Sequence, residues 1–327
     1  MKKILPVFFC FIFLTMLFSC VKESPEPIFD PESVSEKDRK IILIDESQGV
    51  TYNFYNDNTC EIISYDPENA DSTSLILPDM IDGSVVTKIH DNVFSGTAYE
   101  TVTLPKNLRV LGERAFQKSA VKNIVLPDTL TEIGKECFDN CSNLESVSFG
   151  KGLKTIPLGA FYGCKNLKEV ILPEGVTKIE EEAFAALSSL EKVSLPESLE
   201  EIGPYAFWNS GTDSLSFTIP KKVSKIGKNA FLETRWFHMN SDEFFLVGDG
   251  VLLSYKGKET ELSLPDEVKH LSNAFDRSGV KTLALPKALE SIAENSFEGS
   301  KIETIRYEGA DKDILSAIKD YQQEDKA

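Results

Sequence analysis

One motif recurs along most of this 327-residue chain at a nearly constant interval. It can be written L-x-x-I-G-x-x-A-F, followed by a short polar turn and then L-x-x-V-x-L-P. Its phenylalanines fall at positions 94, 116, 138, 161, 184, 207, 231, 275 and 297, so the period is 22 to 24 residues with one interval of double length. A unit this short cannot enclose its own Leu, Ile and Phe side chains. Successive units therefore stack and bury them together, which predicts a solenoid in which each turn contacts its neighbours.

The segment L-x-x-V-x-L, for example residues 167–172, has the alternation of a short strand, and the proline after it ends that strand. Stacked strands of this kind form a parallel ladder along one face. The period lies within the range of leucine-rich repeats. We therefore predict a β-rich leucine-rich-repeat solenoid with a parallel strand ladder over residues 86–307.

The interval of double length contains a different pattern. Residues 244–255 form two apolar runs around Gly248-Asp249-Gly250, which is typical of a β-hairpin. We expect one modified hairpin repeat around residues 237–264.

The regions that flank the repeats are predicted to cap them. Residues 40–85 contain strand-like runs at 41–44, 50–55 and 60–65, which indicate an N-terminal β cap. Residues 308–327 place Ile314, Leu315, Ile318 and Tyr321 at helical spacing, which indicates a short C-terminal helical cap.

The N-terminus has the features of an export signal. Two lysines precede an almost wholly apolar run from Ile4 to Phe18, which is about fifteen residues long. A membrane-spanning helix needs about 20 apolar residues, so residues 1–19 are predicted to be a cleaved signal peptide. Ser19-Cys20 resembles the lipobox of bacterial lipoproteins, which implies lipidation of Cys20, with plain secretion as the alternative. Residues 20–39, rich in Pro, Glu and Ser, then form a flexible tether.

The predicted location follows from the same segment. Cys20-Val21-Lys22-Glu23 partly resembles the export tag of surface lipoproteins of Gram-negative anaerobes. This implies an outer-membrane lipoprotein exposed on the cell surface and attached to the membrane only through the lipid on Cys20.

The charge of the chain excludes one class of partner. The formal net charge is −17, and loss of Lys2 and Lys3 with the signal makes it −19. So acidic a surface repels phosphate backbones, and no basic run with interleaved aromatic residues offsets it. We therefore expect no binding of nucleic acid.

Four cysteines remain after removal of Cys10 and lipidation of Cys20: Cys60, Cys137, Cys141 and Cys164. Cys141 and Cys164 occupy the same repeat position, and Cys137 occupies a position that other repeats fill with Ala. Buried thiols are therefore expected. A Cys137–Cys141 disulfide stays open, because secretion permits it. A zinc site at these cysteines is disfavoured, because no histidine stands at ligand spacing.

No catalytic motif is present. Residues 250–258 lack the glycine spacing and the Ser or Thr of a phosphate-binding loop, and neither G-x-S-x-G nor H-E-x-x-H occurs. His90, His238 and His270 are scattered, with His270 in a variable polar position. We predict a protein that is not an enzyme, and the sequence indicates no cofactor and no metal-ligating residues.

The repeat resembles the BspA-type leucine-rich repeat family of bacterial surface proteins, whose units carry I-G-x-x-A-F-x-x-C-x-x-L-x-x-V-x-L-P. Ile133-Gly134, Cys137-Phe138, Cys141, Leu144 and Val147 match that pattern, whereas Pro157 and Glu180 replace its Gly. The resemblance implies an adhesin or interaction scaffold with a protein ligand, such as a host extracellular-matrix protein. A surface glycan-binding accessory protein and a purely structural envelope protein are the alternatives.

Two surfaces are candidates for binding. The positions that flank the central Val of the strands are expected to face solvent; nine of the sixteen are Ser or Thr and none is aromatic. Aromatic residues lie elsewhere, in turns that vary among repeats. We predict a contact patch formed from Tyr162, Tyr205, Trp208 and Trp236. The alternative is that these rings pack over the flank of the solenoid or under the hairpin.

Overall fold

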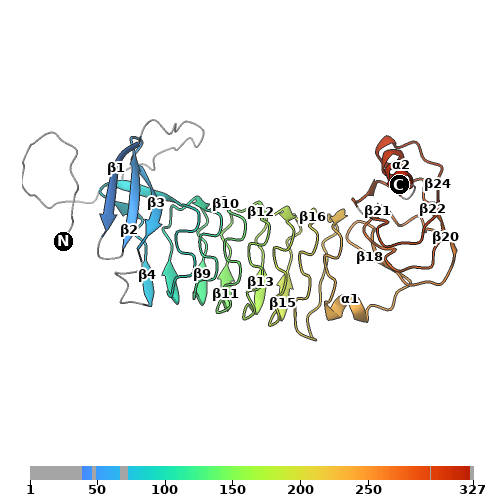
Figure 1. Ribbon diagram of the computed structural model, residues 1–327, viewed down its shortest axis with the longest axis horizontal. Coiled ribbons are helices and arrows are strands. Elements are labelled where there is room, and N and C mark those ends of the chain that lie inside the picture. Colours follow the sequence, from blue (N-terminus) through green and yellow to red (C-terminus); the bar gives the residue numbers. More distant parts are fainter. Residues whose placement is uncertain (1–38, 46–48, 67–72, 295, 325–327) are drawn as a thin grey trace, which may run out of the picture.

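The fold is that of a computed structural model that describes residues 39–45, 49–66, 73–294 and 296–324. These residues form an elongated solenoid whose turns follow one another along a single long axis (Figure 1). The predicted β-rich solenoid with parallel strand ladders is confirmed. The predicted signal peptide, Cys20 and the tether up to residue 38 lie outside the described residues.

Two parallel ladders run along opposite edges of the solenoid (Figure 1). The first contains the L-x-x-I segments: β6 (Ser84–Ile89), β8 (Val110–Leu111), β10 (Glu132–Ile133), β12 (Thr155–Ile156), β14 (Lys178–Ile179), β16 (Glu201–Ile202) and β17 (Lys225–Ile226). The second contains the L-x-x-V-x-L segments: β4 (Ser74–Ile76), β7 (Thr101–Thr103), β9 (Asn123–Val125), β11 (Ser146–Ser148), β13 (Glu169–Ile171) and β15 (Lys192–Ser194).

Antiparallel strands close the N-terminal end. β1 (Arg39–Asp45) pairs with β2 (Val50–Tyr55), which pairs with β3 (Thr59–Tyr65). β3 continues in parallel onto β6, and β5 (Met80–Ile81) pairs with β6 as a hairpin. The second ladder starts at β4, which pairs in parallel with β7. The first rung of that ladder therefore lies within the segment 40–85 that was expected to form the cap.

The repeated phenylalanines form a ladder through the core. Adjacent rings stack with centroids 5.2–5.6 Å apart and planes within 20° of parallel. The ladder comprises Phe94, Phe116, Phe138, Phe161, Phe184, Phe207 and Phe231, none of them more than 2% exposed. Each ring therefore fills the space between its two neighbours, as expected for turns that cannot enclose their own apolar side chains.

The backbone around each phenylalanine bonds to the next turn. Phe138 N–H donates to the Ala160 carbonyl at 2.8 Å, and Asn140 N–H donates to the Tyr162 carbonyl at 2.7 Å. This path requires left-handed residues two positions before and two after the ring, such as Glu136 at φ 53° and Asn140 at φ 55°. Such φ values are uncommon for residues other than glycine, and here they recur turn after turn.

Two of the cysteines belong to a column of side chains that occupies the same position in successive turns. The residue three positions after the ladder phenylalanine is Thr97, Ser119, Cys141, Cys164, Leu187, Ser210 or Thr234, so six of the seven turns place a hydroxyl or thiol there. Cys141 Sγ donates to the Phe116 carbonyl at 2.9 Å and Cys164 Sγ to the Phe138 carbonyl at 3.1 Å. Ser210 Oγ bonds the Phe184 carbonyl in the same way, at 2.8 Å. Cys60, Cys137, Cys141 and Cys164 are all buried free thiols, and burial raises the pKa of Cys60 to about 12.

The predicted hairpin repeat joins two parts of the core. After α1 (Arg235–Met239), β18 (Phe244–Val247) and β19 (Val251–Tyr255) pair antiparallel, as expected. Val251 and Leu253 belong to the larger N-terminal core, whereas Leu252 and Tyr255 belong to a separate C-terminal core. The strand β19 therefore lies between the two cores and contributes side chains to both. The rungs that follow are β20 (Glu261–Ser263), β21 (His270–Leu271), β22 (Thr282–Leu285), β23 (Ser291–Ile292) and β24 (Thr304–Tyr307).

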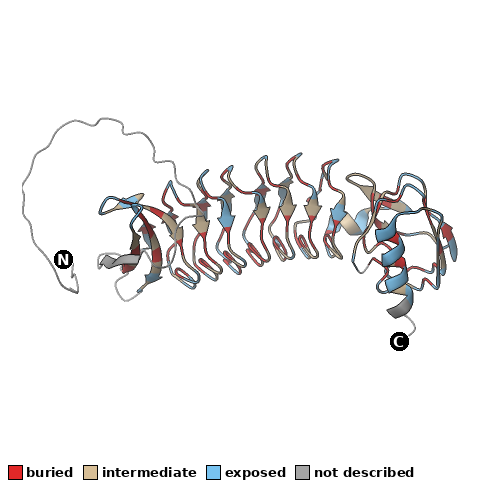
Figure 2. Cartoon of the chain, turned by 90° about the horizontal axis from the view of Figure 1, so that it is seen from above, coloured by how far each residue is buried: buried red, intermediate tan, exposed pale blue. Residues whose placement is uncertain are grey.

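The helix α2 (Lys312–Glu324) covers the C-terminal end. Ile314 and Ile318 are buried, and Tyr321 OH donates to the Ile302 carbonyl at 2.9 Å. Leu315, which shares the helical spacing, is 46% exposed. Figure 2 shows buried residues recurring in every turn and the exposed outer face of this helix. No helix among the described residues is long and apolar enough to cross a membrane.

Candidate functional site

The second ladder leaves one face of a parallel sheet open to solvent. In β7, Thr101 and Thr103 are exposed on either side of buried Val102, and β4, β9, β13 and β20 repeat this pattern. The prediction that these flanking positions face solvent is confirmed for β7, β9 and β13, and β4 and β20 show the same pattern without having been predicted. Parallel sheets are usually covered on both faces, so an open one is a candidate contact surface.

One column of this face alternates between apolar and hydroxyl side chains. The residue after the central apolar residue of each strand is, in successive turns, Ile76, Thr103, Val125, Ser148, Ile171 and Ser194. Strand register pairs Ile76 with Thr103, Val125 with Ser148, and Ile171 with Ser194. Ile76, Val125 and Ile171 are 64%, 66% and 48% exposed, which makes them three of the most exposed large apolar residues described. We call this row the sheet-face column. Ile76 was missed in the sequence because its strand was assigned to the cap, although Leu75-Ile76-Leu77-Pro78 ends with the L-P of the repeat.

A hollow lies beside this column. It has a volume of about 470 Å³ and is lined by residues of three successive turns, including Thr103, Val125 and Ser148 with Lys106 and Asp128 at the strand ends. A hollow that is bordered by an exposed apolar side chain and by two opposite charges can receive a protruding group from a protein ligand.

Tyr162 and Trp208 share a second column, directly after the ladder phenylalanines. Both rings are half-buried, and Ala185, which lies on the turn between them, is fully buried. This position is partly exposed in the other two turns. The small Ala185 side chain is covered because the larger Tyr162 and Trp208 flank it on both sides. These two aromatic residues are therefore brought onto the same flank, two turns apart.

Tyr205 lies close to that flank. It occupies the left-handed position two residues before Phe207, at φ 54°, and its hydroxyl accepts a hydrogen bond from Asn229 Nδ2 at 3.1 Å. Trp208 N–H donates to the Tyr205 carbonyl at 2.9 Å. Tyr162, Tyr205 and Trp208 thus occur on neighbouring turn positions of one flank.

Trp236 is placed differently. It comes from α1, and its ring packs against Phe217, Phe231 and Phe245 with centroids 5.0–5.1 Å apart. One edge remains accessible in a shallow hollow of about 360 Å³ that also includes Arg235 and Met239. Trp236 extends the apolar core beyond the last ladder phenylalanine, and the structure does not bring it together with the other three rings.

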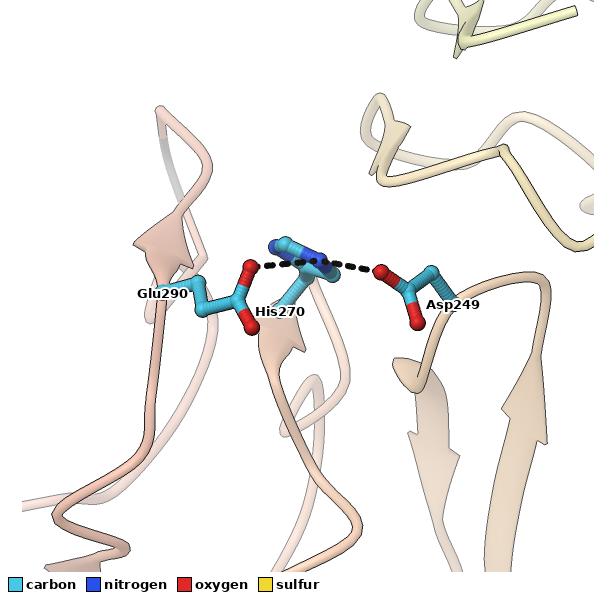
Figure 3. Close-up of side chains that lie close together, drawn as sticks. All are labelled: Asp249, His270 and Glu290. Carbon is cyan, nitrogen blue, oxygen red and sulfur yellow. Dashed lines mark ion pairs between the residues drawn. The ribbon is translucent and has the colours of Figure 1, made fainter.

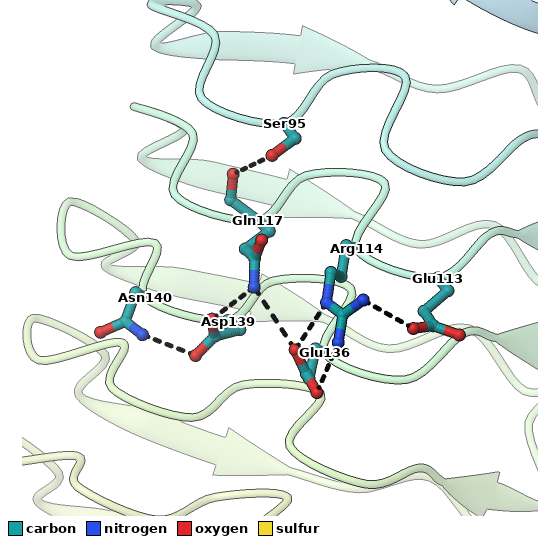
Figure 4. Close-up of polar contacts among 7 residues, drawn as sticks. All are labelled: Ser95, Glu113, Arg114, Gln117, Glu136, Asp139 and Asn140. Carbon is teal, nitrogen blue, oxygen red and sulfur yellow. Dashed lines mark hydrogen bonds and ion pairs between the residues drawn. The ribbon is translucent and has the colours of Figure 1, made fainter.

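Earlier turns carry a polar network on the flank that holds Tyr162 (Figure 4). Arg114 donates to both carboxylate oxygens of Glu136, at 2.7 and 3.1 Å, and also pairs with Glu113 at 2.9 Å. Gln117 Nε2 donates to Asp139 at 2.7 Å. The flank therefore changes from charged groups to aromatic rings along the long axis.

The three histidines occupy unrelated places. His90 Nε2 lies 2.6 Å from Glu61 at the N-terminal end, and the exposed His238 lies 3.5 Å from Glu233. His270, expected in a variable polar position, is buried, and this burial lowers its pKa against the opposing effect of Glu290 and Asp249.

Solved structures of similar proteins share this fold. A leucine-rich cell surface protein from Faecalibacterium prausnitzii is 25% identical, with a TM-score of 0.53 over 83% of this chain and 77% of that chain. The leucine-rich repeat protein of T. pallidum is 26% identical, with a TM-score of 0.51 over 63% of this chain and 90% of that one. A leucine-rich repeat protein from Eubacterium ventriosum is 25% identical, with a TM-score of 0.51 over 62% and 51% of the two chains. No curated protein matches the chain.

The repeats themselves match a known family. The region described as BspA type leucine-rich repeat matches residues 87–213, 154–244 and 247–321, which together cover most of the solenoid. The expected resemblance to this family is confirmed, and the chain belongs to the BspA-type leucine-rich repeat family.

Proposed function

We propose that this protein is a non-catalytic, lipid-anchored cell-surface module that binds a protein ligand through the open face of its second ladder. The sheet-face column carries the proposal, because it presents Ile76, Val125 and Ile171 to solvent at every second turn. Exposed apolar side chains in a regular row are costly to hydrate, and an extended protein contact would cover them. The similarity to a cell surface protein supports display outside the cell.

An extracellular-matrix protein of a host is the ligand class we propose. The sheet face lacks the aromatic anchors that dominate compact, high-affinity interfaces. It offers instead many hydroxyl groups around a few apolar side chains, which suits a weak and extended contact that is repeated along a fibrous ligand. Many such contacts on one cell surface add through multivalency, so an adhesin fits this surface.

The test compares variants of the two candidate surfaces. Binding of the chain from residue 40 to 327 to immobilised matrix proteins is measured for wild type, for Val125→Glu with Ile171→Glu, and for Tyr162→Ala with Trp208→Ala. Leu315→Glu on α2 is the control for an added charge, because it places one glutamate at an exposed apolar position outside both candidate surfaces. Saturable binding that only the sheet-face pair abolishes supports the proposal. Saturable binding that survives this pair would contradict it.

Glycan binding is the second candidate, and one observation favours it. Tyr162 and Trp208 lie half-exposed on one flank, and amphipathic rings of this kind stack on sugars. A glycan array tests it with the same variants. Binding to a sugar that Tyr162→Ala with Trp208→Ala abolishes, and that the sheet-face pair leaves unchanged, would replace the adhesin with a glycan-binding accessory protein. No binding on either panel would favour a structural role in the envelope.

The lipid anchor has its own test. Cys20→Ser should release the protein from membranes into the soluble fraction, because the acyl chains on Cys20 are the only proposed membrane attachment. Surface display is tested on intact cells by protease accessibility. Continued membrane partitioning of the Cys20→Ser variant would contradict the anchor.

A further inference from the structure

Three side chains of the C-terminal segment converge on one point, although they come from different turns. Asp249 lies in the β18–β19 turn, His270 in β21 and Glu290 directly before β23. Val251 pairs with His270 and His270 with Ser291 in parallel register, so β19, β21 and β23 are successive rungs. The register of the ladder therefore brings the three side chains together.

His270 differs from its equivalents in other turns. The first position of these short strands is exposed in Glu132 and Lys225, as expected for the outer edge of a ladder. The His270 side chain is only 7% exposed. A buried imidazole must have partners for both ring nitrogens, because an unpaired buried polar atom costs about 1–3 kcal/mol.

Only one of those nitrogens has a hydrogen-bond partner in the described part of the chain. Nδ1 lies 2.9 Å from Ser291 Oγ, whereas Nε2 is buried without a hydrogen bond. Figure 3 shows that the ring lies between the two carboxylates. Nε2 is 3.9 Å from Asp249 Oδ2 and 3.9 Å from Glu290 Oε2, too far for a hydrogen bond to either.

The second oxygen of each carboxylate faces another group. Lys269 Nζ lies 2.8 Å from Asp249 Oδ1 and 3.8 Å from Glu290 Oε1. The ammonium thus balances part of the negative charge from one side. It leaves Oδ2 and Oε2 directed at the histidine, so that one nitrogen and two oxygens face a common point.

We propose that Asp249, His270 and Glu290 form a binding site for a divalent transition-metal ion, with zinc as the best match. One imidazole nitrogen and two carboxylate oxygens are ligands that zinc accepts, with a fourth position left for water. The three ligand atoms lie within 4.8 Å of one another.

Small side-chain movements would complete the site. Tetrahedral zinc with bonds of about 2.1 Å holds its ligand atoms roughly 3.4 Å apart. Each carboxylate must therefore approach Nε2 by about half an ångström, and the ligand atoms, which now lie within 4.8 Å of one another, must all close to that spacing. Glu290 is exposed and Asp249 half-exposed, so both have room to shift, against the restraint of their ion pairs with Lys269. The hydrogen bond between Nδ1 and Ser291 would orient the ring, as second-shell groups commonly do for metal-bound histidines.

The bound ion would link the hairpin to the two turns that follow it. β19 separates the two cores, so a ligand from its turn and two from the next rungs would hold the C-terminal segment against the hairpin. The site is independent of the ligand-binding proposal, because it lies on the rungs β19, β21 and β23 rather than on the open sheet face of the second ladder.

The experiment is a calorimetric titration of the metal-free mature protein with zinc chloride, repeated with cobalt chloride and calcium chloride. We expect one zinc site per chain and at least tenfold weaker binding in Asp249→Asn and in Glu290→Gln. Both substitutions keep the shape of the side chain, so they are expected to fold, and thermal unfolding verifies it. Glu303→Gln is the matched control, because Glu303 is an exposed carboxylate paired with Lys281 at 2.9 Å and has no histidine beside it.

Lys269→Met provides a test in the opposite direction. Removal of the ammonium frees both carboxylates, so zinc should bind more tightly than to wild type by a factor of several. The absence of saturable 1:1 zinc binding would overturn the proposal. So would zinc binding that Asp249→Asn and Glu290→Gln leave within twofold of wild type, or a preference for calcium over zinc.

Discussion

Phe161 and Phe184 lie one turn apart and stack with ring centroids 5.5 Å apart and an interplanar angle of 7°. Phe184 also stacks on Phe207, so its ring contacts a neighbour on each side. This arrangement is the unit of stability in the solenoid, because each turn completes its core only with the turns beside it.

Replacement of Phe184 by Ala should therefore lower the free energy of unfolding by about 3–5 kcal/mol. The measurement is urea unfolding followed by circular dichroism. Phe184→Leu, which keeps most of the apolar volume, is the control and should cost clearly less. A loss below about 1 kcal/mol for Phe184→Ala would mean that the ring is not a member of a close-packed ladder.

The column that holds Cys164 makes a second prediction. Cys164→Ser should be tolerated, because Ser210 makes the same bond to a ladder carbonyl in another turn. Cys164→Ala should lose about 0.5–1.5 kcal/mol, because one hydrogen bond to the Phe138 carbonyl is lost while that carbonyl still accepts from Cys141 N–H at 3.1 Å. Unfolding of both variants measures the difference. Equal stability of the Ala and Ser variants would show that the column serves packing alone.

Trp208 and Trp236 should respond differently to the same substitution. Trp236→Ala removes a ring that packs against Phe217, Phe231 and Phe245, and should cost about 3–5 kcal/mol. Trp208→Ala should cost less, because its position admits Gln117, Asp139 and Ala185 in other turns. Thermal unfolding of the two single variants checks this. A larger loss for Trp208 would place that ring in the core and remove it from the candidate contact patch.

Much of this fold could be predicted from the sequence because the same spacing of apolar residues recurs in many successive repeats. The phenylalanine frame, the Val-centred strands, the hairpin at Gly248-Asp249-Gly250 and the C-terminal helix all follow from local periodicity. Features that depend on contacts between unlike segments could not be predicted in this way. Burial of His270 arises from the Asp249 turn of the hairpin and from Glu290 and Ser291 of the next turn, and the packing of Trp236 arises where the phenylalanine ladder ends.

The candidate site shows the same limit. The alternation of exposed and buried residues in each strand could be predicted from the sequence. The sheet-face column could not, because it depends on strand register between turns and on a first strand, β4, that precedes the regular repeats. The aromatic residues were identifiable one by one. Their grouping was not, since Tyr162 and Trp208 share a column whereas Trp236 comes from an inserted helix.

Glu61 at the N-terminal end predicts a pH dependence of stability. Burial by itself would raise its pKa, but hydrogen bonds from His90 and Tyr55 have the larger combined effect, so the pKa is lowered from 4.5. Tyr55 OH donates to Glu61 at 2.8 Å, and the Glu61 side chain is 19% exposed. The unfolded chain then binds more protons than the folded chain at pH values near 4.5, so stability falls as pH decreases.

The wild type should consequently be more stable than Glu61→Gln at pH 7, and the difference should shrink as pH falls through 4.5 and below it. The contribution is present above the unfolded pKa and is lost as the pH passes the lower pKa of the folded state. Thermal unfolding of both proteins between pH 7 and pH 3 measures the difference. Glu132→Gln is the control, because Glu132 is exposed at the edge of its strand and should show no comparable loss. A difference between wild type and Glu61→Gln that stays constant over this range would mean that the carboxylate gains nothing from His90 and Tyr55.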